Sequence, residues 1–207
     1  VLFLNRMGQK YNRQDWISES IHQVLLHIKY LYDKKTGLFY HGWTFNTRDN
    51  FGGVFWCRGN SWFTVGILEY LEMFKGSLDA GVREFIVNTY KSQVHTLKKL
   101  QSSSGLWHTV LDDPTSYEEV SGSAAITAGI LKGIKLGILD DSCLDCAWKG
   151  VRAVMNQIDK DGTVLNVSGG TGMGADREHY KNILIAPMAY GQSLTILALI
   201  QALDNLN

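Results

Sequence analysis

The sequence predicts an all-α protein that forms a toroid of helical hairpins. Apolar residues recur at helical spacing in about six or seven segments, and no segment of useful length alternates strictly between apolar and polar residues. The helical segments are of two kinds. Those near 80–100 and 143–158 carry charges on one face, whereas 121–136 and 190–203 are apolar or small nearly all round. Outer and inner helices of this kind are typical of a closed α/α toroid.

Six helices are expected in chain order, each from its own apolar spacing. The first contains apolar positions from Trp16 to Leu31, and the second starts near Asn60, a plausible N-cap residue. The third follows the apolar positions from Val82 to Leu97, and the remaining three follow the apolar and small residues of their segments. The predicted ranges are 14–33, 60 to the mid-70s, 82–97, 121–136, 143–158 and 190–203.

A short pattern returns between the helices and predicts a repeat. The sequences TGLFYHGW at 36, SGLWHTVL at 104 and DGTVLNVS at 161 each place a turn glycine before apolar residues and a polar end. The three starts are 68 and 57 residues apart. A repeat of this length, with about two helices in each unit, indicates an array of α-hairpins. Six hairpins of roughly 55 residues need about 330 residues. The 207 residues are therefore either part of a barrel or an open array, and a start at Val1 rather than at a methionine favours one partial domain without its N-terminal hairpins.

The composition excludes several classes of partner. Lys plus Arg and Asp plus Glu are both 20, so no net charge recruits nucleic acid or an anionic membrane. No apolar run approaches the roughly 20 residues that span a bilayer. Three cysteines leave one unpaired, which favours a reducing compartment and a cytoplasmic location. Cys143 and Cys146 form one C-x-x-C pair; zinc needs four ligands and a redox pair usually accompanies a βαβ unit, so no metal site is expected.

The segment from Thr36 to Trp62 is the strongest candidate site. It contains Trp43, Trp56 and Trp62 together with Arg58. Tryptophan rings stack on the apolar faces of sugars, and a guanidinium binds a carboxylate with two hydrogen bonds, so the group points to an acidic sugar. The alternative is structural: the tryptophans belong to the core and Arg58 pairs with a helix C-terminus.

Two further groups could contribute to the same site. His41 and His108 occupy matching positions in the first two repeat loops, so both are expected to face a shared cavity and to orient a substrate or move a proton. Glu119 and Ser121 begin an inner helix, where the alternative role is helix capping. The glycine-rich stretch 169–180 lacks the G-K-[ST] ending of a phosphate loop, and we expect it to form a loop at the rim of the cavity.

Four stretches together resemble the C-terminal half of glycoside hydrolase family 105 and its sister family 88. They are GLFYHGW, FWCRGNSWFTVGILEYLE, YEEVSGSAAITAGILKGIKLGIL and APMAYGQSLTILAL. The resemblance covers essentially the whole chain and implies an (α/α)6 barrel. It also implies removal of the 4,5-unsaturated uronic acid that polysaccharide lyases leave at the non-reducing end of oligosaccharides, as in rhamnogalacturonan degradation. In this mechanism an acid protonates the C4=C5 bond, water adds at C5, and the hemiketal opens without a metal or organic cofactor.

When the family's residue roles are assigned to the matching positions, the resemblance implies an assisting catalytic role for His41. It makes Trp56, Arg58 and Trp62 substrate contacts, with Arg58 toward the uronate carboxylate or nearby hydroxyls. Glu119 matches the E-x-S segment with Ser121. We place both, together with Trp43 and His108, among the expected substrate-binding residues.

The main acid of the family, an aspartate, falls a few residues before Val1 by the same register. Asp15, Asp33 and Asp49 do not lie in that context. We therefore expect the 207 residues alone to be inactive.

Two other functions stay open from the residues. One is a non-catalytic carbohydrate-binding or scaffold toroid, and the other is an epimerase-like toroid that uses His41 and His108 as an acid and base pair. The expected partner is an oligosaccharide ending in an unsaturated uronate. An exposed inner layer would be a large apolar patch, so a missing segment or a homodimer is expected to cover it.

Overall fold

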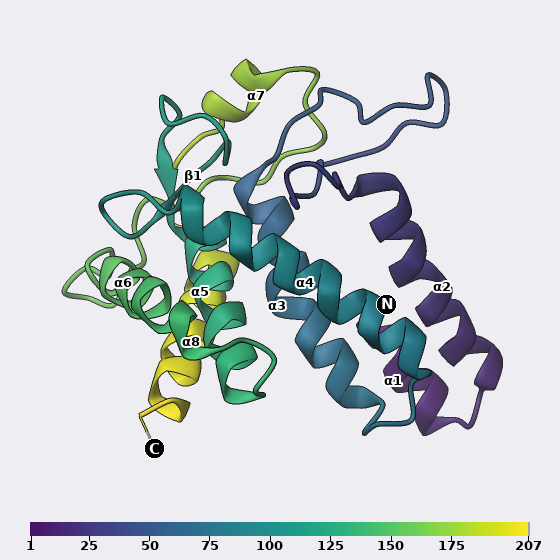
Figure 1. Cartoon of the computed structure of the whole chain (residues 1–207). Coiled ribbons are helices and arrows are strands. Elements are labelled where there is room, and N and C mark those ends of the chain that lie inside the picture. Colours follow the sequence, from purple (N-terminus) through teal and green to yellow (C-terminus); the bar gives the residue numbers. More distant parts are fainter. Residues whose placement is uncertain (207) are drawn as a thin grey trace.

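The computed structural model describes residues 1–206, which form helices and one very short sheet (Figure 1). The strands β1 (Trp107–His108) and β2 (Glu118–Glu119) pair antiparallel. The helices are α1 (Leu2–Lys10), α2 (Gln14–Leu31), α3 (Cys57–Met73), α4 (Ala80–Leu100), α5 (Val120–Lys135), the 3-10 turn η1 (Asp141–Cys143), α6 (Leu144–Met155), α7 (Arg177–Lys181) and α8 (Ala189–Asp204). The all-α prediction is confirmed.

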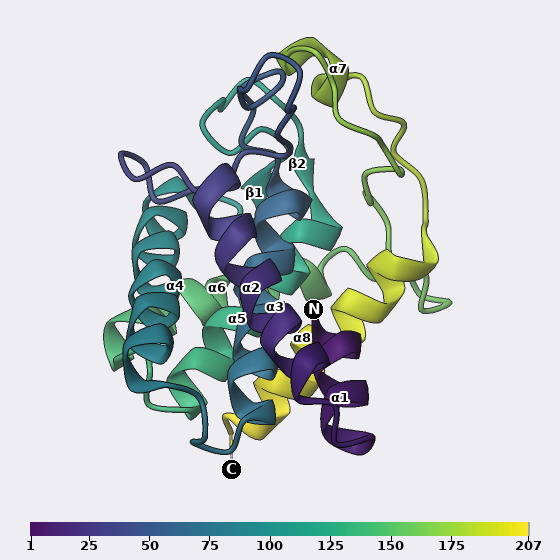
Figure 2. The same ribbon diagram turned by 90° about the vertical axis from the view of Figure 1, so that its right-hand side faces the viewer.

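The helices form two layers that follow an arc. Helices α1, α3, α5 and α8 make the inner layer, in which α3 packs against α5 and α5 against α8. Helices α2, α4 and α6 each pair with the inner helix before them and make the outer layer. Figure 2 shows α4 and α6 on one side of α3 and α5, while α1 and α8 extend on the other side. The predicted division into inner and outer helices is therefore confirmed.

Helix α5 is the centre of the inner layer and is buried from Val120 to Gly133. Its small residues let neighbouring helices approach closely. A Cβ added at Gly129 would lie 2.6 Å from the carbonyl oxygen of Thr64 on α3, and one at Gly122 would lie 2.9 Å from the backbone nitrogen of Arg58. The start of α3, where the candidate site lies, is thus held directly against the start of α5.

The predicted repeat is present in the backbone. Gly37, Gly105 and Gly162 have φ values of 79°, 99° and 87°, in the left-handed region that favours glycine. The N–H of each glycine donates to a carbonyl three or four residues earlier, on Asp33, Ser102 and Asp159 respectively. Each turn follows an outer helix and precedes the next inner helix, so these long connections lie mainly at one end of the layers, the upper end in Figure 2.

Three details differ from the predicted helices. Residues Leu2–Lys10 form a helix that was not predicted, and α7 overlaps the end of the stretch 169–180, which was predicted to be a loop. Helix α3 begins at Cys57, so Asn60 is not its N-cap. The Asn60 side chain instead accepts a hydrogen bond from the N–H of Phe39 and donates to its carbonyl, both at 2.8 Å. Asn60 therefore ties the first repeat loop to the inner layer.

Apolar side chains are exposed at the two ends of the arc. On α8, Ile196 is 50%, Ile200 48% and Leu203 61% exposed, and on α1 Phe3 is 76% exposed. The first three share one face of α8 by their helical spacing. Within residues 1–206, no helix combines the length and hydropathy of a membrane span. Cys57, Cys143 and Cys146 are free and buried.

Candidate active site

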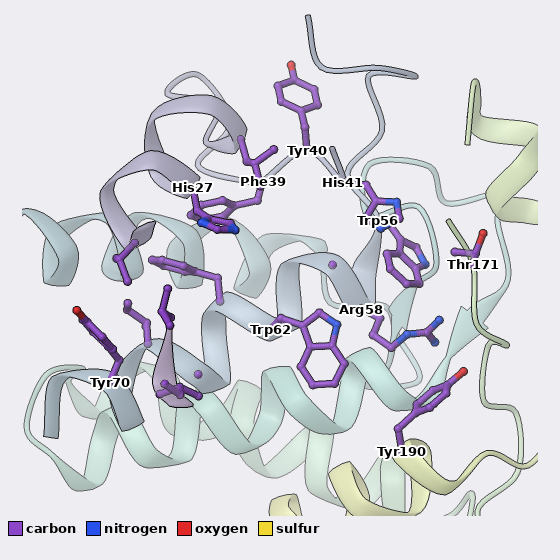
Figure 3. A pocket seen from close by; sticks show the side chains of 18 of the residues that line it. His27, Phe39, Tyr40, His41, Trp56, Arg58, Trp62, Tyr70, Thr171 and Tyr190 are labelled. Atoms are coloured by element: carbon purple, nitrogen blue, oxygen red, sulfur yellow. The ribbon is translucent and has the colours of Figure 1, made fainter. Parts of the chain in front are cut away.

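A cavity of about 720 Å³ lies against α1, α2 and α3 and reaches the loop before α8 (Figure 3). One end is mainly apolar and contains Phe39 and Tyr70, and the other contains His41, Arg58 and Tyr190. The indole of Trp62 lies between these ends and is 50% exposed. No aspartate or glutamate of the described chain is among the residues that line it. The cavity therefore offers rings and N–H donors but no carboxylate.

Arg58 is the central cation of the polar end and is only 3% exposed. Its Nη1 donates to the Ser121 hydroxyl at 3.0 Å and to the Ser168 carbonyl at 2.7 Å, and its Nη2 donates to the Gly169 carbonyl at 2.6 Å. The guanidinium carbon lies 4.3 Å from the ring centroid of Trp56 and 4.7 Å from that of Tyr190. Two aromatic rings and three acceptors thus fix the plane of the guanidinium.

The guanidinium keeps donors that nothing in residues 1–206 uses. A guanidinium has about five N–H donors, and the hydrogen bonds of Arg58 occupy three. The remaining two are on Nε and Nη2. These two nitrogens form one edge of the planar group, the geometry that binds a carboxylate through two parallel hydrogen bonds. Because Arg58 lines the cavity, an anion could reach this edge.

Glu119 interacts with Arg58 through its charge and through the Ser121 hydroxyl. Its buried carboxylate accepts hydrogen bonds from the N–H groups of Ser121 and Gly122 and from the Ser121 hydroxyl, which in turn accepts from Arg58. Burial raises the pKa of Glu119, and the Arg58 charge opposes that rise. Glu119 is the N-cap of α5, so the capping alternative describes its contacts. The structure places neither Glu119 nor Ser121 in the cavity lining.

His41 lines the cavity beside Arg58. Its Nδ1 is 2.6 Å from the hydroxyl oxygen of Tyr180, and its ring centroid lies 4.4 Å from that of Trp56. Burial, with the charges of Arg58 and His179, lowers the pKa of His41 to about 4. The imidazole is therefore neutral at pH 7.

The segment 169–176, which is the part of the predicted loop 169–180 that precedes α7 and is here called the rim loop, borders the polar end of the cavity. Gly170 and Thr171 line the cavity, and the Gly169 carbonyl accepts from Arg58. Farther along, the Gly174 N–H donates to the Tyr180 hydroxyl at 3.0 Å. Arg58 and Tyr180 therefore hold the two ends of the rim loop.

Two predicted site residues lie elsewhere. Trp43 does not line the cavity; its ring packs against Tyr30 at 5.1 Å and near Phe45 at 6.4 Å. The expectation that His108 shares a cavity with His41 is wrong, because His108 is outside the lining and its Nδ1 is 2.5 Å from the Ser116 carbonyl. His41 is four residues after its turn glycine, whereas His108 is three after its own. Consecutive side chains of an extended segment point to opposite sides, so this difference turns His108 away.

Sequence reasoning missed Tyr180 and Tyr190, which complete the site. Tyr180 is fully buried and Tyr190 lies at the start of α8. Tyr190 belongs to the quoted stretch APMAYG, which was a usable signal, whereas nothing local marks Tyr180. Among residues 1–206, no three His, Cys, Asp or Glu side chains are grouped to hold a metal ion.

Comparison with known proteins decides the family. The model of the family described as Glycosyl Hydrolase Family 88 matches residues 1–206. The chain belongs to Glycosyl Hydrolase Family 88. Among its relatives, unsaturated rhamnogalacturonyl hydrolase YesR of Bacillus subtilis is 32% identical over 200 residues, which are 95% of this chain and 56% of that protein. This Family 88 chain thus spans about half the length of that relative.

Solved structures agree with the fold of this Family 88 chain. A Salmonella enterica serovar Paratyphi A protein, described as a possible member of the GH105 family, superimposes with a TM-score of 0.96 and 39% identity over 99% of this chain and 54% of that one. The unsaturated glucuronyl hydrolase of Bacillus sp. GL1 shares the fold, with a TM-score of 0.74 at 16% identity over 97% of this chain and 56% of that one. The predicted (α/α)6 toroid, of which the chain forms about half, is confirmed.

Proposed function

We propose that this chain forms the sugar-binding side of an active site that removes 4,5-unsaturated uronic acid from oligosaccharides. The observation that carries the proposal is the state of Arg58, which is fixed between Trp56 and Tyr190 and keeps two N–H donors at the cavity. A uronate offers a planar carboxylate to that edge and a ring face to Trp62. The relative's name, unsaturated rhamnogalacturonyl hydrolase, supports the same class of substrate.

The proposed reaction is hydration of the C4=C5 double bond. A proton is added at C4, the C5 cation is shared with the ring oxygen, and water adds at C5 and loses a proton. The resulting hemiketal opens by cleavage of the bond between C5 and the ring oxygen, which leaves a ketone at C5 and a hemiacetal at C1. The C1 hemiacetal then collapses to an aldehyde, and the next sugar leaves with the glycosidic oxygen and a proton. Arg58 would hold the carboxylate next to C5, and neutral His41 would donate a hydrogen bond to a substrate oxygen. Since no carboxylate lines this cavity, the general acid must come from outside the described lining, and we expect these residues alone not to turn over substrate.

A non-catalytic sugar-binding protein is the second candidate, and the absence of a carboxylate from the described lining favours it. The epimerase-like alternative loses its basis, because His108 does not join His41 in the cavity.

Two measurements test the proposal. Tryptophan fluorescence would follow binding of a lyase-generated unsaturated disaccharide and of its saturated counterpart, and ultraviolet absorbance would follow loss of the double bond. We expect the 207-residue chain to bind the unsaturated sugar without consuming it, and the Bacillus subtilis relative, as positive control, to consume it. Arg58→Lys should weaken binding, because an ammonium cannot donate the two parallel hydrogen bonds that a guanidinium edge makes to a carboxylate. Lack of binding by the folded chain would refute the proposed site. Turnover of the unsaturated sugar by the chain would refute the proposal that the general acid lies outside these residues.

A further inference from the structure

The hydroxyl of Tyr180 connects two parts of the site that are far apart in sequence. It lies 2.6 Å from Nδ1 of His41, 139 residues earlier, and accepts the N–H of Gly174 at 3.0 Å. Tyr180 is fully buried and lies on α7, a short helix whose N-cap is Asp176. The ring of Tyr180 also contacts the rings of His41 and Trp56, with centroids 5.5 Å and 6.0 Å away. Tyr180 is thus packed firmly behind the cavity wall.

The hydrogen-bonding capacity of these groups fixes the positions of their protons. A backbone N–H only donates, so the Tyr180 oxygen is the acceptor for Gly174. The hydroxyl has one proton, and His41 Nδ1 is its only recorded acceptor within residues 1–206. If Nδ1 carried the proton instead, the buried hydroxyl proton would have no partner, which is costly. The satisfied arrangement has Tyr180 donating to an unprotonated Nδ1.

We infer that Tyr180 is a positioning residue that holds His41 as the neutral tautomer with its proton on Nε2. Within residues 1–206 no atom is recorded as a partner of Nε2, and the His41 ring lines the cavity. His41 therefore presents an N–H donor to whatever enters, and it cannot act as a general base through the nitrogen that faces Tyr180. The use of this donor toward a uronate oxygen rests on the proposed function, whereas the proton arrangement itself does not.

The charges around His41 act in the same direction. The Arg58 guanidinium and the His179 imidazole are the ionisable groups whose charges act on the His41 ring, and both disfavour an imidazolium there. A protonated His41 would carry hydrogens on both ring nitrogens and would leave the Tyr180 proton unpaired. Geometry, burial and neighbouring charge thus all favour the neutral ring.

Two other histidines of the chain supply internal references. Nδ1 of His27 lies 2.6 Å from the Gln23 carbonyl, and Nδ1 of His108 lies 2.5 Å from the Ser116 carbonyl. A carbonyl only accepts, so these two rings carry their proton on Nδ1 when neutral, the opposite of His41. One spectrum therefore contains both tautomers.

The test is a long-range ¹⁵N–¹H correlation spectrum of the histidine rings of the labelled 207-residue chain at pH 7, with the His41 signals assigned from the His41→Gln variant. We expect a pyridine-type Nδ1 and a pyrrole-type Nε2 for His41, and the reverse for His108. In Tyr180→Phe, the His41 shifts should move toward an average of both tautomers and its titration toward the ordinary pKa. The matched control is Tyr90→Phe, which removes another fully buried hydroxyl, one that donates to the Gly129 carbonyl. It should leave His41 unchanged.

A pyrrole-type Nδ1 of His41 in the wild-type chain would overturn the inference, as would unchanged His41 shifts in a folded Tyr180→Phe. If Tyr180→Phe does not fold, the wild-type spectrum decides alone. Titration of the unsaturated disaccharide into the same sample separates the two proposals. A correct tautomer without binding would refute the proposed function and leave the role of Tyr180 intact.

Discussion

Arg58→Lys is the substitution whose cost the structure defines most sharply. The guanidinium donates to two backbone carbonyls and to the Ser121 hydroxyl, and it is almost fully buried. A lysine ammonium keeps the charge but reaches at most one of these acceptors in good geometry. Hydrogen bonds to a charged donor contribute about 1.5–3 kcal/mol each, so loss of two predicts a decrease of about 3–6 kcal/mol in the free energy of unfolding. That is a large share of the roughly 5–15 kcal/mol of a typical domain.

The assay is equilibrium unfolding in urea, followed by tryptophan fluorescence and by far-ultraviolet circular dichroism. Arg177→Lys is the matched control, because it makes the same chemical change in an ion pair with Asp112 whose side chains are 42% and 32% exposed. Such surface pairs contribute about 0–1 kcal/mol, so this variant should unfold nearly as the wild type does. If Arg58→Lys lowers the free energy of unfolding by no more than Arg177→Lys does, the three hydrogen bonds of the buried Arg58 guanidinium do not stabilise the fold and the prediction is wrong.

Three further predictions concern packing, pH and association. Gly129→Ala should destabilise by about 1–3 kcal/mol because its Cβ would lie 2.6 Å from the Thr64 carbonyl oxygen, whereas Gly66→Ala, with no atom nearer than 4.0 Å, should gain up to about 1 kcal/mol in urea unfolding. The pKa of about 4 for His41 lies below the ordinary value, so the unfolded chain binds this proton first and stability falls as pH drops from about 6.5 to 4, by about 3 kcal/mol at most, since solvent screens the partly exposed ring. His41→Gln should flatten that part of the unfolding curve, and an unchanged slope would contradict the assignment. Ile200→Glu should reduce concentration-dependent association in sedimentation velocity, because it places a charge in the exposed apolar face of α8. Unchanged association would contradict self-association through that face.

The helices were predictable because their apolar spacing reflects burial in two layers. Helix α5 is nearly free of charge because it is surrounded on all sides, and that composition is visible in the sequence. The start of α3 was not predictable from periodicity. Its first turn contains Arg58 and Gly59, which line the cavity, and Cys57, which packs against Gly122 of α5, rather than an apolar stripe. A functional first turn therefore shifted the predicted start by about three residues.

The site was predictable where its residues are near one another in the chain. His41, Trp56, Arg58 and Trp62 all lie within or beside one loop, and all four line the cavity. Tyr180 was not predictable, because its contact with His41 spans 139 residues and depends on the path of the rim loop. The prediction for His108 failed for the opposite reason. Its local sequence pattern matches that of His41, but its side chain points to the other side of the extended segment. Proximity in sequence indicates membership of a site, whereas orientation is decided by the fold.

The anchoring of the rim loop links the ligand to the mobility of that loop. Arg58 holds one end through the Ser168 and Gly169 carbonyls, and Tyr180 holds the other through the Gly174 N–H. A ligand that uses only the unoccupied edge of Arg58 leaves these anchors in place, and amide exchange at Gly174 should then slow. A ligand that competes with the carbonyls for Arg58 should free the loop and speed that exchange. By thermodynamic reciprocity, a ligand that shifts the loop equilibrium by a given factor binds the two loop states with affinities that differ by the same factor.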